Sequence, residues 1–111
     1  MEKLPDINKS MTMVIAQRAL ELELNGKIQK LLLKIGQPIQ DVQTASGLDW
    51  RCPIMISGLS DEVYNACGLD SIQALGLAFS KAFNLLAEFE EQYQAKIRWL
   101  GGSGHGLANF S

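Results

Sequence analysis

The chain has 111 residues, 47% of them hydrophobic and 20% charged, and ten basic against twelve acidic side chains leave a formal net charge of −2. This composition excludes a disordered chain, and a chain of this length supports one hydrophobic core. We therefore expect a single domain, with its core at about residues 12–101 and a glycine-rich tail at 102–111.

The N-terminus lacks the basic start and long apolar region of a secretory signal. No apolar run approaches the roughly 20 residues that a membrane-spanning helix needs. The sequence therefore predicts a cytoplasmic protein that makes no membrane contact.

The first regular pattern is an alternation of leucines with polar or small residues over 19–24. Asn25-Gly26 then supplies the two residues of a type I′ turn, and Leu31, Leu33 and Ile35 recur with a period of two beyond it. The pattern predicts a β-hairpin with one apolar face and one polar face.

Two further strands are expected after this hairpin. Pro38 ends the second arm, and the polar stretch 40–49 predicts a loop. Residues 50–57 are rich in β-forming side chains and predict a third strand, with Pro53 at an edge or a bulge. Residues 61–67 favour a short fourth strand, although so short a stretch also fits a helical turn.

Asp70 predicts the start of a long helix that runs to about Tyr93, because its carboxylate can cap free backbone N–H groups and Gln73 completes a capping-box-like pair. Leu77 falls on the polar side of this helix, whereas Glu90 falls in line with its apolar stripe. We expect that stripe to cover the sheet, and its members are Ile72, Leu75, Phe79, Ala82, Phe83, Leu86, Phe89 and Tyr93.

A last short strand is expected at 96–100, with Ile97 and Trp99 on one side, and a flexible tail after it. His105 lies in the glycine run, so we expect it to be exposed to solvent. The elements together predict an α+β fold, an antiparallel sheet of four to five strands with one long helix packed on one face.

The sequence predicts no catalytic residues, no cofactor and no metal site. The single histidine lies in the glycine run rather than on a rigid scaffold, and no helix with a Lys-Ser/Thr pair follows that run to bind phosphate. Cys52 and Cys67 lack metal-ligand spacing and have apolar neighbours, so we interpret them as structural thiols.

Charge is uneven along the chain: residues 61–111 carry six acidic and three basic side chains. The nearest approach to a basic stripe, at Lys27, Lys30 and Lys34, is explained by a solvated strand face, so we expect no direct contact with nucleic acid. The acidic side chains form a solvated surface or meet a basic partner. The candidate partner-binding residues are Asp61, Glu62, Glu88, Glu90 and Glu91.

Three motifs recur together in a known set of proteins: the stretch 49–53 (Asp-Trp-Arg-Cys-Pro), the helix start 68–75 (Gly-Leu-Asp-Ser-Ile-Gln-Ala-Leu) and the close 97–102 (Ile-Arg-Trp-Leu-Gly-Gly). Over residues 14–102 the chain resembles a family of short bacterial proteins of unknown function, and no catalytic residue comes with that resemblance. By type it also resembles the immunity proteins encoded beside antibacterial toxins.

The resemblance and the acidic residues lead to one functional expectation, an immunity protein that binds and neutralises a cognate protein toxin such as a nuclease of contact-dependent growth inhibition. Two alternatives stay open. A homo-oligomeric structural protein would use an uncovered sheet face or edge, with the apolar stretch 11–16 and Leu77 as its signals. A small-ligand domain would place residues 50–51 (Trp-Arg) and 98–99 (Arg-Trp) around one pocket, whereas core packing also explains both tryptophans.

Overall fold

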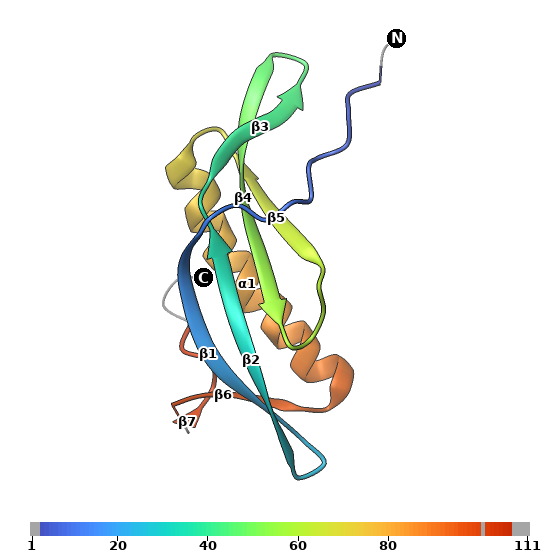
Figure 1. The fold of residues 1–111 in the computed structure, drawn as a ribbon, viewed down its shortest axis with the longest axis vertical. Helices are drawn as coiled ribbons and strands as arrows, with labels where there is room; N and C mark the ends of the chain where they lie inside the picture. The colour runs from blue at the N-terminus through green and yellow to red at the C-terminus, as the bar shows by residue number, and fades with distance from the viewer. Residues whose placement is uncertain (1–2, 101, 108–111) are drawn as a thin grey trace.

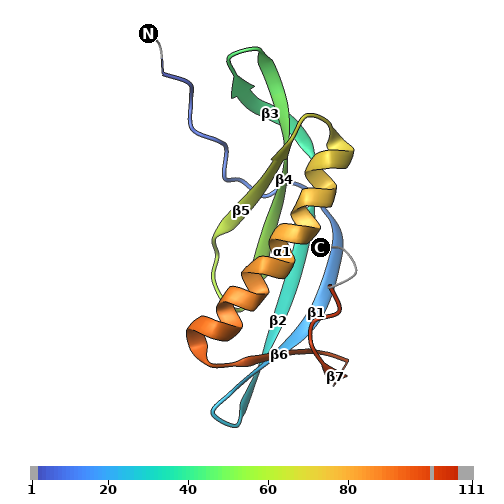
Figure 2. The same cartoon turned by 180° about the vertical axis from the view of Figure 1, so that it is seen from behind.

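The computed structural model of the chain describes residues 3–100 and 102–107. It confirms the α+β class: one helix lies along one face of a curled antiparallel sheet (Figures 1 and 2). The elements are β1 (Val14–Leu24), β2 (Lys27–Gly36), β3 (Ile39–Thr44), β4 (Gly47–Ser57), β5 (Val63–Gly68), α1 (Ser71–Tyr93), β6 (Lys96–Trp99) and β7 (Gly102–Ser103). The strand order is β3-β4-β2-β1-β6-β7. β3 and β2 pair with successive parts of one edge of β4, and β5 pairs with its opposite edge.

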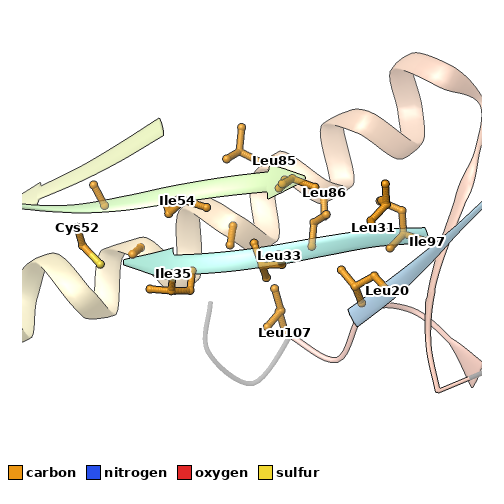
Figure 3. Close-up of a cluster of buried hydrophobic side chains, with 14 of the residues drawn as sticks. Leu20, Leu31, Leu33, Ile35, Cys52, Ile54, Leu85, Leu86, Ile97 and Leu107 are labelled. Carbon is orange, nitrogen blue, oxygen red and sulfur yellow. The ribbon is translucent and has the colours of Figure 1, made fainter. Parts of the chain in front are cut away.

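The predicted hairpin is confirmed. Asn25 and Gly26 have φ values of 53° and 77°, as a type I′ turn requires. β1 and β2 pair from this turn back to Val14 and Gly36. The alternating leucines of both arms are buried in the core, except Leu24, which is partly buried. Figure 3 shows Leu31, Leu33 and the other side chains that meet in this core.

The stretch 40–49, predicted to be a loop, is instead largely strand. β3 pairs with β4 from Ile39 opposite Arg51 to Thr44 opposite Gly47. Val42 is its one buried residue, so backbone bonds to β4 hold this strand rather than an apolar pattern. A polar edge strand of this kind carries no hydrophobic periodicity, which explains why the sequence predicts a loop here.

Pro53 lies on an internal strand, at a break in the pairing along one edge. β2 pairs with β4 as far as Ile54, and β3 takes over at Arg51, so Pro53 falls between two partners. A residue without a backbone N–H fits there because no donor is missing from either ladder. At the same bend a Cβ on Gly36 would lie 2.7 Å from Pro53 Cγ, so the close approach requires glycine.

The start of α1 is confirmed. Asp70 is its N-cap, and Asp70 Oδ1 accepts the Gln73 backbone N–H at 2.7 Å. Gln73 Oε1 in turn accepts the Leu69 N–H at 2.7 Å, one residue before the cap. The helix ends at Gln94, which takes the left-handed conformation with φ of 52°.

The buried face of α1 differs from the predicted stripe. The buried helix residues are Ala74, Ala78, Ala82, Leu85 and Leu86. Ile72, which the stripe placed against the sheet, is 81% exposed. Three alanines four residues apart let the helix backbone lie close to the sheet, and the larger phenylalanines are displaced to the flank, where they are only partly buried.

The C-terminal segment is docked rather than free. The predicted last strand is present as β6, which pairs with β1, and Trp99 then pairs with Gly102 of β7. His105, expected to be exposed, is only 7% exposed, and Leu107 is 3% exposed within the core (Figure 3). The rest of the predicted flexible tail, Gly101 and residues 108–111, lies outside the described residues.

Among the residues that the structure describes, no helix combines the length and the hydrophobicity needed to cross a membrane.

Enlarging the alanine face should separate helix from sheet. Ala78 is fully buried, so Ala78→Leu is expected to lower the free energy of unfolding by about 1–3 kcal/mol through overpacking. The same substitution at exposed Ala87 is expected to change it by less than about 0.5 kcal/mol. Urea denaturation of both variants measures the difference, and equal stabilities would contradict the close packing described here.

Candidate partner-binding surface

The loop between β4 and β5 presents Asp61 and Glu62 to solvent. It is built as a tight turn in which the N–H groups of Leu59 and Ser60 both donate to the Ile56 carbonyl, at 3.2 and 3.3 Å. Gly58 has a φ of 101° there, and a Cβ at this position would lie 2.7 Å from the Lys30 carbonyl oxygen. The turn therefore lies close against β2, and Asp61 and Glu62 follow it in the chain.

Tyr64 lies at the start of β5, directly after this loop. Its hydroxyl donates to Glu62 Oε2 at 3.2 Å. Burial raises the pKa of Tyr64 above its ordinary value, as do the hydrogen bond to Glu62 and the charges of Glu62 and Glu88, while a hydrogen bond with Ser60 opposes them. Glu62 is therefore in hydrogen-bond contact with the Tyr64 hydroxyl, whereas Glu88 of α1 acts on it only through its charge.

The five predicted acidic residues are not all exposed. Glu91 lies one helical turn after Glu88 and is exposed like it. Glu90 is partly buried, and its carboxylate accepts the Ile97 N–H at 3.0 Å. That bond explains why a glutamate falls in line with apolar helix positions. We refer to Asp61, Glu62, Glu88 and Glu91 as the acidic surface.

Arg51 is used inside the fold. It is 1% exposed, and its Nε and Nη2 donate to both oxygens of Asp41, at 2.7 and 3.1 Å. Nη1 donates to the Ser10 carbonyl at 2.8 Å and to Asn65 Oδ1 at 3.0 Å, and Nη2 also contacts Ser10 Oγ at 3.4 Å. All five guanidinium N–H groups thus have acceptors, and the arginine ties the N-terminal segment to the sheet.

The Trp and Arg side chains expected around one ligand pocket lie in separate surroundings. Trp50 lines a groove of about 380 Å³ at the start of α1, beside Ile72. Arg98 forms an ion pair with Glu23 at 2.8 Å, and both side chains are well exposed. The pocket proposed from residues 50–51 and 98–99 is therefore not formed.

The aromatic–arginine pair that the structure does contain is Trp99 with Arg18, which sequence analysis did not single out. The Arg18 guanidinium lies 3.7 Å from the centre of the Trp99 ring, and its Nη1 donates to the His105 carbonyl at 3.1 Å. The His105 ring packs edge-on against Phe83, with ring centres 5.2 Å apart. The glycine run around His105 predicts a flexible tail, so no local signal in the sequence indicated this contact.

The two cysteines differ. Cys52 is buried, its Sγ lies 3.2 Å from the Gly36 carbonyl oxygen, and burial raises its pKa to about 11. This matches the structural role predicted for it. Cys67 is exposed, so the same prediction is wrong for this residue: it sits on an outer strand that pairs only on its β4 side. Within the described residues, no three His, Cys, Asp or Glu side chains gather in a way that would hold a metal ion.

A family model described as a domain of unknown function, DUF6968, matches residues 16–109. Because the match covers most of the chain, the chain belongs to this family. No curated protein and no solved structure matches the chain.

Removing the buried guanidinium tests its structural role. Arg51→Met leaves Asp41 without its partner and is expected to cost about 3 kcal/mol of unfolding free energy and to open the N-terminal segment to proteases. Arg98→Met breaks an exposed pair and is expected to cost at most about 1 kcal/mol. Urea denaturation and limited proteolysis check both variants. A stable Arg51→Met protein with a protected N-terminus would show that the arginine serves another purpose.

The two cysteines should differ in their reactivity toward a thiol reagent. At about pH 8 Ellman's reagent is expected to modify Cys67 and to leave Cys52 unmodified, because the thiolate is the reactive form and Cys52 is both buried and shifted to a pKa of about 11. Cys67→Ser should abolish the reaction of the native protein. A native Cys67→Ser protein that still reacts would contradict the burial of Cys52.

Proposed function

We propose that this DUF6968 domain is a bacterial immunity protein, which binds a cognate protein toxin in the cytoplasm and covers the surface that the toxin uses on its own substrate. The observation that carries the proposal is the acidic surface of four exposed carboxylates, in which Glu62 accepts a hydrogen bond from the Tyr64 hydroxyl. A nuclease is the kind of toxin that this surface fits.

Charge complementarity supports this partner. A nuclease domain binds phosphate groups and therefore carries basic side chains around its active site. The acidic surface meets such a region with opposite charge, which speeds association and fixes the orientation of the two proteins. Tyr64 adds a partly exposed aromatic ring among the carboxylates, and tyrosine is enriched in protein interfaces.

The buried polar residues also support a binding function over a catalytic one, because their hydrogen-bonding groups bind other parts of the chain. Every donor of Arg51 is used in bonds to Ser10, Asp41 and Asn65. The Nδ1 of His105 accepts the Leu107 N–H, and its carbonyl accepts from Arg18 of β1. These side chains hold the fold together.

One observation favours a second function, self-association. At the start of α1, Leu69 and Ile72 are 76% and 81% exposed, and Ile72 lines the groove beside Trp50. Exposed apolar side chains next to a groove are typical of subunit contacts. A mass that rises with protein concentration in sedimentation experiments would support this function, and a constant monomer mass would exclude it.

Reversing two charges tests the immunity proposal. The protein is co-expressed with the C-terminal domain encoded by the adjacent gene, and growth and binding are both measured. The wild type should rescue growth, and the double variant Glu62→Lys with Glu88→Lys should bind about tenfold or more weakly and lose rescue. The weakening should shrink at high salt, because screening removes the charge term.

Asp6→Lys is the matched control, since Asp6 is an exposed carboxylate in the N-terminal segment. It should bind like the wild type. A neighbouring domain that is harmless or unbound would refute the immunity function itself. Equal weakening by the control and the double variant would instead place the interface elsewhere on the chain.

A further inference from the structure

The C-terminal segment Gly102–Leu107, here called the strap, contacts β6 through the pair of Gly102 with Trp99 and the bridge of Gly104 with Arg98. Leu107 is its apolar anchor, 3% exposed and close to Leu33 in the core (Figure 3). Beside Leu107 the core leaves a cavity of about 100 Å³, which Leu33, Ile35 and Phe79 also line. Displacing the strap would therefore open an apolar surface between β1 and α1.

His105 is the polar anchor of the strap. Its Nδ1 accepts the Leu107 N–H at 3.3 Å, which requires the neutral imidazole with Nδ1 unprotonated. Its carbonyl accepts from Arg18 at 3.1 Å. The imidazole thus fixes the backbone of Leu107, the residue whose side chain enters the core.

The charges around the imidazole come from two elements. Arg18 of β1, which is held against the Trp99 ring, and Glu90 of α1 both act on the imidazole through their charges. Burial is the largest effect and lowers the pKa of His105 below its ordinary value of 6.5, Glu90 raises it, and Arg18 lowers it. The neutral imidazole is therefore the form that the docked strap favours.

We propose that the strap is an acid-operated latch, in which a proton on Nδ1 of His105 releases residues 102–107 from the core. The proton replaces the acceptor of the Leu107 N–H with a second donor. It also places a new positive charge beside Arg18. Both changes act on the one side chain that fixes the Leu107 backbone, so the strap detaches while the sheet and α1 keep their own contacts.

The direction with pH follows from proton binding. The released strap exposes His105 and binds a proton more readily than the docked strap does, because docking lowers the pKa of His105. Docking is thus fully favoured above about pH 6.5 and weakens as pH falls through the lower pKa of the docked state.

Nuclear magnetic resonance of the full chain tests the latch. The His105 ring signal and the amide signals of the strap are followed from about pH 7.5 to about pH 5. The strap amides should move toward unstructured positions with the same midpoint as the His105 ring, while amides of β4 and α1 stay in place. Strap amides that stay docked after the ring has titrated would overturn the proposal.

Three variants sharpen the test. Gly106→Ala gives the released state at neutral pH, because a Cβ there would lie 2.9 Å from Arg18 Nη1 and would collide with the Trp99 ring. His105→Asn offers an uncharged acceptor near the position of Nδ1, so its strap should stay docked throughout the range. A docked His105→Asn strap that is released in acid would overturn the proposal.

If the strap of His105→Asn fails to dock, Glu90→Gln tests whether release of the strap depends on protonation of His105. The amide oxygen can still accept the Ile97 N–H, but the charge that raises the pKa of His105 is gone. The midpoint of strap release should therefore shift to lower pH. An unchanged or higher midpoint would show that strap release does not depend on His105 protonation.

Discussion

The close approach of α1 to the sheet is the constraint on which the rest of the structure depends. Ala74, Ala78 and Ala82 are fully buried and face the strands. At the end of β5, a Cβ on Gly68 would lie 2.7 Å from the Ala74 nitrogen, so the strand also lacks room for a side chain. With small residues on the contact face, the phenylalanines occupy the flank, and Phe83 is there to meet the His105 ring.

The N-terminal segment and the strap are bound by polar groups on opposite faces of the sheet. Side chains alternate along β4, so Arg51 points away from Cys52 and Ile54, which lie beneath α1. Arg51 therefore binds the N-terminal segment across the uncovered face, visible in front of the sheet in Figure 1. His105 and Arg18 bind the strap on the helix side. Each attachment depends on one buried polar side chain, Arg51 or His105, so a single substitution should weaken it.

The sequence predicted what local signals determine. The turn at Asn25, the cap at Asp70 and the period of two in the first hairpin are all properties of neighbouring residues, and the structure confirms them. It did not predict β3, the true buried face of α1 or the docking of His105, because each depends on a distant partner.

For the acidic residues too, the sequence predicted local properties but not contacts with distant parts of the chain. Their charge can be read directly from the sequence, but the hydrogen bond between the Tyr64 hydroxyl and Glu62 appears only in the folded chain. Glu90 appeared to share the acidic cluster because it is adjacent to Glu91 in the chain. Its bond to the Ile97 N–H is visible only once β6 returns beside the helix.

The contact between Arg18 and His105 joins residues 87 positions apart, which has a consequence for synthesis. The hairpin of β1 and β2 can form early, but the outer edge of β1 waits for β6 and the strap, which the ribosome makes later. Such long-range closure makes folding slow. In the interval the exposed edge of β1 is a template for pairing with other chains, and the charges of Arg18, Glu21 and Glu23 along that strand guard it against aggregation.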